Sequence, residues 1–222
     1  MKTALIIGAS RGIGREFVRQ LLADQYKVFA TARDDESLQR LQSEGAQAVR
    51  TDVTAPESMA ELPRQLDGEQ LDLVVYVAGV FESFDGATES PGAAAFDATM
   101  HANVLGAMQS IPLLAPLLKP SIGRFAFITS GMGSIADAES SMGWIYRASK
   151  AALNMAVHSA CHDYPDITLV TMNPGWVKTD MGGSGAPTSV ADSVAGMINV
   201  IGKLRQSDSG SFQSYDGRKM AW

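Results

Sequence analysis

The sequence has few residues that bind metals or form disulfides. Its 222 residues include one cysteine, Cys161, and three histidines. A single cysteine cannot form an internal disulfide, and no cysteine and histidine spacing typical of a zinc site occurs. Because chains without disulfides suit reducing compartments, we expect a cytoplasmic protein that holds no structural metal.

Long apolar runs and clusters of basic residues are also missing. The apolar run near the start extends only from Ala4 to Ile7, which is too short for the core of a signal peptide or for a membrane span. Lysine and arginine number 18 against 24 acidic residues, a formal charge of -6, whereas nucleic-acid binding usually needs a basic surface. We therefore expect no membrane or nucleic-acid partner, and expect small molecules and other copies of the chain instead.

Short β-rich segments and amphipathic helical segments alternate along the whole chain. This alternation is typical of a parallel sheet covered by helices on both faces. The predicted strands are Thr3–Ile7, Lys27–Thr31, Ala46–Arg50, Leu71–Val77, Arg124–Thr129, Thr168–Asn173 and Phe212–Tyr215. The predicted helices are Ile13–Ala23, Asp35–Ser43, Pro56–Leu66, Ala93–Leu118, Ile145–Tyr164 and Val190–Leu204.

With 45% hydrophobic and 19% charged residues, the chain has enough apolar content for one sizeable core. We predict a single α/β domain over residues 1–222, a doubly wound, mostly parallel seven-stranded sheet of the Rossmann type. Pro112 and Pro116 lie inside the fourth helical pattern, so that helix should kink or break there. Asp35 and Ser37 offer capping groups at the start of the second helix.

Three glycines follow the first predicted strand with the spacing Gly-x3-Gly-x-Gly, and a helical pattern begins at once. Glycines in such a turn let the amides at the start of the helix approach a pyrophosphate. Alone they would fit an ordinary tight turn, but their place between the first strand and the first helix favours a nucleotide site. The predicted contacts in this loop are Gly8, Ser10, Arg11, Gly12, Ile13 and Gly14.

The end of the second strand indicates which dinucleotide binds. Sites for NAD usually place an acidic residue there to hold the ribose 2′-hydroxyl, and this chain has Arg33 instead. Arg33 and Arg11 could together bind a 2′-phosphate. Asp34 and Asp35 follow directly, and their negative charges argue against a 2′-phosphate at this place. On balance the sequence predicts NADP(H) in preference to NAD(H).

Asp52 and Val53 follow the third predicted strand, and both are predicted contacts of the cofactor. The carboxylate of Asp52 could accept a hydrogen bond from the amino group of an adenine. It could equally cap the next helix, and the sequence does not separate these alternatives.

Tyr146 and Lys150 lie four positions apart at the start of a predicted helix, so the phenol and the ammonium group share one helix face. Tyr-x3-Lys alone is a common pattern and could be a surface pair. Its position after a fifth strand that ends at Ser130 favours a functional site.

Motifs in a fixed order extend this interpretation to the whole chain. They are Gly8-x3-Gly12-x-Gly14, Asp52, Ala78-Gly79, Asn103, Ser130, Tyr146-x3-Lys150 and Pro174-Gly175. In this order and at these intervals the chain resembles the short-chain dehydrogenases/reductases along essentially its whole length. Its short length and its last residues, 215–222, make it most similar to the small C-factor and sniffer-type carbonyl reductases.

The resemblance implies roles for the catalytic residues. Tyr146 would be the general acid in reduction and the base in oxidation. A tyrosine ordinarily titrates near ~10, so Lys150 would supply the cation that makes the phenolate accessible and would also hold the ribose hydroxyls. Ser130 would hydrogen-bond the substrate oxygen. Asn103 would hold a water that passes protons to Lys150; without the resemblance, a satisfied amide in mid-helix is the alternative.

The resemblance also implies a nicotinamide cofactor, with its binding half at about residues 1–120 and the catalytic and substrate half at about 121–222. The turn after the sixth strand lies at the ligand-binding edge of a parallel sheet. There it would cradle the nicotinamide, with Thr179 hydrogen-bonded to the carboxamide. The further predicted cofactor contacts are Ala78, Gly79, Tyr146, Lys150, Pro174, Gly175 and Val177.

The chain departs from the family pattern at two places. Ile7 stands where the family usually has threonine, and Tyr76-Val77 stand where it usually has two asparagines. The support of the cofactor loop and of the central strand should therefore be altered. Ser134 is a second candidate for the catalytic serine, but Ser130 is preferred because it ends the strand.

The segment after Thr179 would be the substrate lid, and here it is short. Its residues 182–187 are rich in glycine, so we expect them to be mobile. Candidate pocket walls are Phe81, Met132, Trp144, Trp176 and Met181, although each could be ordinary core. They favour an apolar substrate with one polar reacting group.

The sequence thus predicts an NADP(H)-dependent oxidoreductase that acts on a small-molecule carbonyl or alcohol. The helices that contain Asn103 and Tyr146 are rich in alanine and, as in the family, would join a homodimer or homotetramer. One rival is a nucleotide-binding sensor or cell-signalling protein with little turnover. Another is an interaction protein without a cofactor, which the glycine loop disfavours.

Overall fold

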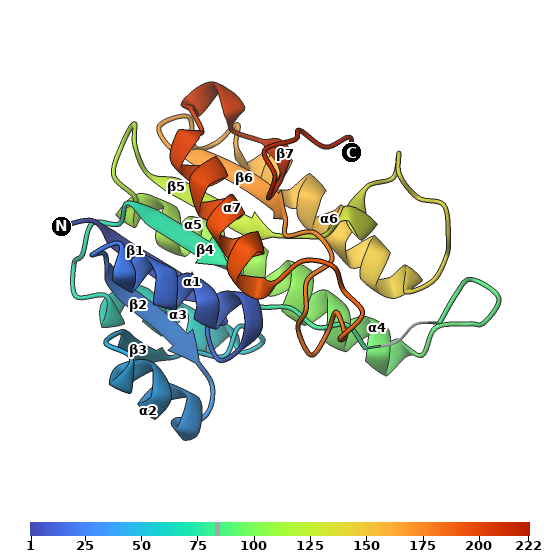
Figure 1. Ribbon diagram of the computed structural model, residues 1–222, viewed down its shortest axis with the longest axis horizontal. Coiled ribbons are helices and arrows are strands. Elements are labelled where there is room, and N and C mark those ends of the chain that lie inside the picture. Colours follow the sequence, from blue (N-terminus) through green and yellow to red (C-terminus); the bar gives the residue numbers. More distant parts are fainter. Residues whose placement is uncertain (83–84) are drawn as a thin grey trace.

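Seven parallel strands form one sheet at the centre of the fold (Figure 1), in a computed structural model that describes residues 1–82 and 85–222. Their order is β3-β2-β1-β4-β5-β6-β7. The strands are β1 (Thr3–Ile7), β2 (Lys27–Ala32), β3 (Gln47–Arg50), β4 (Leu73–Tyr76), β5 (Arg124–Ile128), β6 (Thr168–Asn173) and β7 (Ser211–Ser214). Every residue of β1 and β4 is buried, because helices cover both faces of a parallel sheet.

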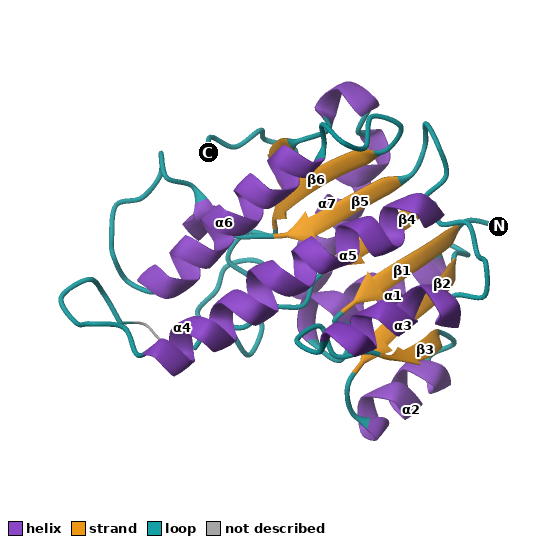
Figure 2. Cartoon of the chain, turned by 180° about the vertical axis from the view of Figure 1, so that it is seen from behind, coloured by secondary structure: helices purple, strands orange, loops and turns teal. Residues whose placement is uncertain are grey.

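The helices are α1 (Gly12–Ala23), α2 (Asp35–Ser43), α3 (Pro56–Gln65), α4 (Ala93–Met100), α5 (Gly106–Leu114), α6 (Trp144–Ala160) and α7 (Val190–Lys203). Residues of α1, α2 and α7, such as Phe17 and Val194, form the core on one face of the sheet. Residues of α3, α5 and α6, such as Leu62 and Leu153, form the core on the other. Figure 1 shows α1 and α7 in front of the sheet, and Figure 2 shows α5 and α6 from behind. The predicted doubly wound α/β architecture is confirmed.

The strand order reverses at β1, which pairs with β2 on one side and with β4 on the other. In open parallel sheets, ligands bind outside the carboxyl ends of the strands at such a reversal. α4 and the start of α6 project beyond this edge of the sheet (Figures 1 and 2). The fold therefore places the expected site between these helices and the loops that follow β1, β4, β5 and β6.

The long helix predicted for residues 93–118 is interrupted twice, at one of the two prolines, Pro116, and at a segment without proline. A π-helical segment, His101–Leu105, separates α4 from α5. α5 then continues through Pro112, where the missing N–H costs a hydrogen bond to Met108, a half-exposed residue. The predicted break occurs only at the 3₁₀ turn Ala115–Leu117, which contains Pro116.

The cap of α2 also differs from the prediction. Its side-chain cap is Asp34, which accepts a hydrogen bond of 2.8 Å from the backbone N–H of Ser37. Asp35 already lies within the first turn of the helix, so the predicted capping residue was one position too late.

Among residues 1–82 and 85–222, none of the helices combines the length and the apolar content that a membrane span requires.

Candidate active site

A cavity of about 1270 Å³ opens at the carboxyl edge of the sheet. Pockets for a single drug-sized ligand usually measure about 300–1,000 Å³, so this one has room for a larger ligand or for two. The predicted site residues that line it are Gly8, Ser10, Arg11, Gly12, Ile13, Arg33, Val53, Ala78, Gly79, Ser130, Tyr146, Lys150, Pro174, Gly175, Val177 and Thr179. Gly14, Asp52 and Asn103 are not among its lining residues.

The glycine turn after β1 brings two backbone segments into close contact. Gly8 has φ +87°, and a Cβ there would lie 2.7 Å from the backbone nitrogen of Ala78. A Cβ at Gly14 would lie 2.1 Å from the carbonyl oxygen of Gly8. Since no side chain fits at either position, the two glycines let the turn pack closely against the loop after β4 and against the start of α1, as in the tight turn of a dinucleotide-binding loop.

A threonine from the next strand supports this turn. The N–H of Gly8 donates to the hydroxyl of Thr31 over 3.0 Å, and the N–H of Ala9 donates to the Thr31 carbonyl over 2.8 Å. Thr31 is buried at the end of β2. It therefore provides a hydroxyl beside the loop although Ile7 has none.

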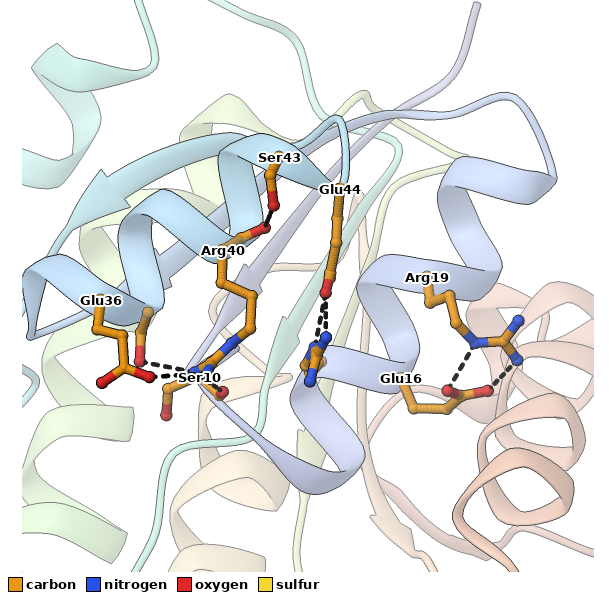
Figure 3. Close-up of polar contacts among 9 residues, drawn as sticks. Ser10, Glu16, Arg19, Glu36, Arg40, Ser43 and Glu44 are labelled. Atoms are coloured by element: carbon orange, nitrogen blue, oxygen red, sulfur yellow. Dashed lines mark hydrogen bonds and ion pairs between the residues drawn. The ribbon is translucent and has the colours of Figure 1, made fainter.

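An arginine of α2 also holds the glycine loop. Figure 3 shows the guanidinium of Arg40 reaching Ser10, whose carbonyl oxygen it binds at 3.1 Å. The same nitrogen donates to the hydroxyl of Ser37 at 3.1 Å. This role of Arg40 could not be predicted from the sequence, because a polar residue on a surface helix carries no signal that its side chain turns inward.

The two arginines predicted to bind a 2′-phosphate both line the cavity. Arg11 makes an ion pair of 3.0 Å with Asp180 of the lid segment, and both side chains are about three-quarters exposed. Arg33 is exposed at the end of β2. The acids beside it have other partners, since Asp34 caps α2 and Asp35 pairs with Arg50.

Asp52 is occupied by its own turn. Its carboxylate accepts hydrogen bonds from the N–H and the hydroxyl of Thr54, at 2.9 and 2.7 Å. Burial opposes ionisation, but these bonds outweigh it and hold the pKa of Asp52 below its ordinary value. α3 has Ala55 at its cap position and no side-chain cap, so the capping alternative for Asp52 is wrong.

Tyr146 and Ser130 both line the cavity, one from the first turn of α6 and the other from the position two residues after the end of β5. Burial raises the pKa of Tyr146 to about 12, and a hydrogen bond with Ser130 opposes this shift. The Ser130 hydroxyl also accepts from the N–H of Met132 at 3.1 Å, which fixes its orientation. Ser134, the alternative serine, instead bonds to Ala221 and Asp137 and does not line the cavity.

Lys150 lies one helical turn after Tyr146 and is buried. Its Nζ donates to the carbonyl oxygen of Ile128 at 3.0 Å and lies 5.5 Å from the centre of the Tyr146 ring. Burial lowers the pKa of Lys150 to about 8. Burial has the largest effect on the pKa of Tyr146 as well. That pKa lies above its ordinary value although the Lys150 ammonium is nearby.

The side chain of Asn103 is fully buried and joins three segments. Its Oδ1 accepts from the N–H of Val80 at 2.7 Å, and its Nδ2 donates to the Val80 carbonyl and to the Ser149 hydroxyl, both at 3.0 Å. The amide thus links the loop after β4 to α6, where Ser149 precedes Lys150. A water held by Asn103 remains a prediction.

Asn173, which the sequence analysis did not single out, connects two loops of the site. Its Oδ1 accepts from the N–H of Gly131 at 2.9 Å and from the N–H of Gly175 at 3.1 Å. One amide oxygen therefore holds the loop after Ser130 against the turn after β6. Its position before Pro174 carried no such signal.

The lid segment is tied by its own hydrogen bonds. The indole N–H of Trp176 donates to the Gly182 carbonyl at 2.8 Å, and the N–H of Gly182 donates to the Thr179 hydroxyl at 3.0 Å. At its base, the N–H of Lys178 donates to the carbonyl of Thr188 at 2.9 Å. These bonds tie Gly182 and the base of the lid to neighbouring residues, and the mobility of residues 182–187 stays a prediction.

The walls beyond Tyr146 are apolar. Phe81, Met132, Trp176 and Met181 line the cavity as predicted, and the ring of Phe81 meets the Tyr146 ring edge-on at 4.8 Å between centres. The prediction for Trp144 was wrong, because Met142 lies in the wall and Trp144 does not.

Comparisons with known proteins agree with this arrangement. Residues 2–189 match the family model described as short chain dehydrogenase. The chain is 42% identical to the C-signal protein of Myxococcus xanthus over 127 residues, which cover 56% of this chain and 76% of the relative.

Two solved structures superimpose on essentially the whole chain. The carbonyl reductase Sniffer of D. melanogaster has 29% identity and a TM-score of 0.93, with 100% of both chains covered. The NADPH-bound carbonyl reductase from chicken fatty liver has 32% identity and a TM-score of 0.90, with 100% of this chain and 99% of that chain covered. With its motifs placed around one cavity, the chain belongs to the short-chain dehydrogenase family of oxidoreductases.

Proposed function

We propose that the chain is an NADP(H)-dependent carbonyl reductase that interconverts a carbonyl compound and its alcohol. The observation that carries the proposal is that Ser130, Tyr146 and the buried Lys150 line one cavity, with Lys150 one helical turn after Tyr146. A nicotinamide cofactor, when bound, supplies the hydride for reduction or accepts it in oxidation.

In reduction, Tyr146 acts as the general acid. The raised pKa keeps its hydroxyl protonated at neutral pH, so a proton is available as the carbonyl carbon gains hydride and the C=O π bond becomes a C–O single bond. That proton passes to the substrate oxygen, which Ser130 holds by a hydrogen bond. Lys150 stabilises the phenolate left behind, and Tyr146 regains a proton from solvent through Lys150 and a water at Asn103.

The residues present fit a dinucleotide with a 2′-phosphate. The glycine turn would receive the pyrophosphate, and Arg11 and Arg33, which both line the cavity, would bind the 2′-phosphate, while the carboxylate of Asp34 is engaged as the cap of α2. Thr179 and the turn at Gly175 would hold the nicotinamide end. The chicken carbonyl reductase, which binds NADPH, supports this choice.

The substrate is an apolar carbonyl compound with one polar reacting group. Phe81, Met132, Trp176 and Met181 offer aromatic and thioether surfaces around Tyr146. Such surfaces bind flat or bulky apolar groups and adapt to several shapes.

The test is NADPH oxidation with a panel of aldehydes, ketones, diketones and quinones, run in parallel with wild type and Tyr146→Phe. We expect turnover by the wild type and a loss of at least about a hundredfold in the variant, because a general acid typically contributes 10²–10⁴-fold. Binding of NADPH, followed by fluorescence, should be retained in both. Equal turnover in the two proteins would refute the role of Tyr146.

A second candidate, a cell-signalling protein with little turnover, is favoured by the 42% identity to C-signal. The same experiment separates the two functions. NADPH binding by both proteins without turnover on any compound of the panel would favour signalling.

A further inference from the structure

Tyr76 is a large polar side chain enclosed in the core, at the last position of β4. It is completely buried and packs against Phe127, with 6.0 Å between ring centres. Its hydroxyl donates a hydrogen bond of 3.1 Å to the carbonyl oxygen of Ala102. Burial, with a contribution from Asp52, raises the pKa of Tyr76, so the hydroxyl stays protonated as a donor.

Ala102 lies in the π-helical segment His101–Leu105, next to Asn103. In a regular α-helix the N–H of Gly106 would donate to the Ala102 carbonyl. Here that N–H donates to His101 instead. The Tyr76 hydroxyl thus reaches a carbonyl whose usual helical donor has been redirected. π-helical segments of this kind often occur at functional sites.

Gly106 makes room for the tyrosine. A Cβ at Gly106 would lie 2.6 Å from the Tyr76 hydroxyl oxygen and 2.6 Å from the carbonyl oxygen of Val53. The buried phenol and the missing side chain therefore fit one another. A smaller residue at position 76 would leave space at this glycine, and any larger residue at 106 would displace the hydroxyl.

We propose that Tyr76 is a positioning residue, whose hydroxyl holds the π-helical segment in the register that directs Asn103 toward Val80 and Ser149. Asn103 links the loop that contains Gly79 to the helix that carries Tyr146 and Lys150. Loss of the hydroxyl would let the helix regain α-helical pairing and shift Asn103. As far as catalysis is concerned, this inference rests on the proposed reductase function.

The first arm of the test is an NMR measurement that does not depend on enzymatic activity. Tyr76→Phe keeps the packing on Phe127 and removes the single hydroxyl, and Tyr164→Phe, on the loop after α6, is the matched control. The chain has four asparagines, so selective ¹⁵N-asparagine labelling gives few side-chain amide signals, and Asn103→Asp identifies that of Asn103. We expect Tyr76→Phe to shift this signal and Tyr164→Phe to leave it in place.

The second arm is a double-mutant cycle on kcat with Tyr76→Phe and Asn103→Leu. If Tyr76 acts through Asn103, we expect Tyr76→Phe to lower kcat about tenfold in the wild type, because small displacements at a catalytic site are costly. In the Asn103→Leu background it should then have little further effect. A merely structural role would lower kcat equally in both backgrounds.

An unmoved Asn103 signal, or equal losses of kcat in both backgrounds, would overturn the proposal. A wild type that binds NADPH but turns over no compound would count against the reductase function alone, and the amide signal would then decide the role of Tyr76. If Asn103→Leu does not fold, the amide signal and kcat of Tyr76→Phe, each against the Tyr164→Phe control, decide it.

Discussion

Burial acts on two titratable residues of the site in opposite directions. It raises the pKa of Tyr146 to about 12 and lowers that of Lys150 to about 8, because a low-dielectric surrounding disfavours the charged form of each. At neutral pH both groups hold their protons. The folded chain is therefore prepared to donate a proton, which suits the reducing direction of the proposed reaction.

The buried lysine should leave a signature in stability against pH. The pKa of Lys150 falls from 10.5 to about 8 on folding, so between these values the unfolded chain binds more protons and the wild type gains stability as pH rises. Below about pH 8 the full cost of burying the charge remains. The variant Lys150→Met lacks this cost at every pH. The difference in free energy of unfolding, variant minus wild type, should therefore fall by about 3 kcal/mol between pH 7 and pH 10.5.

Urea unfolding at several pH values measures this difference. Tyr146 affects stability in the opposite sense above about pH 10. Its pKa is higher in the folded chain than in the unfolded chain, so the unfolded chain loses the phenolic proton first and the free energy of unfolding falls as pH rises. Tyr146 is present in both proteins, so its contribution cancels in the comparison. If this difference stays constant with pH, burial does not lower the pKa of Lys150 in the folded state.

At the scale of elements, the sequence predicts what depends on local pattern and misses what depends on tertiary contact. β1 and α2 could be placed from their apolar spacing, and the glycine turn from its place between strand and helix. The π-helical segment could not be predicted, because it depends on a hydroxyl that Tyr76 brings from a strand. Nor could Arg40, whose contact with Ser10 joins residues thirty positions apart.

The lid offers the element-scale prediction. Arg11 forms an ion pair with Asp180, and both residues line the cavity. The proposed 2′-phosphate would compete for the same guanidinium. An exposed ion pair is worth at most about 1 kcal/mol. Asp180→Asn should therefore tighten NADPH binding by about two- to fivefold and change NADH binding less.

Fluorescence titration with both cofactors measures the effect, with Asp24→Asn at the far end of α1 as the control. Weaker NADPH binding by Asp180→Asn would contradict competition. It would mean that the pair instead holds the lid over the bound cofactor.

At the scale of the whole molecule, α4, α5 and α6 lie side by side (Figure 2), and each of them exposes a large apolar side chain. Phe96 is 41% exposed, Met108 50% and Met155 64%. Monomeric proteins rarely expose large continuous apolar patches. The face of these helices is accordingly where we place the interface of the expected homodimer.

A charge on this face should separate the subunits. We expect size-exclusion chromatography with light scattering to give a dimer for the wild type and, at the same concentration, a monomer for Met155→Lys, because a lysine facing a symmetric copy must be buried without a partner. Ile122→Lys, at an apolar position of comparable exposure on the loop before β5, should stay dimeric. A monomeric wild type, or a dimer that survives Met155→Lys and falls apart with Ile122→Lys, would place assembly elsewhere. Because α6 carries Tyr146 and Lys150 on its inner side, retained NADPH turnover in the monomeric variant would also show that the site is complete within one chain.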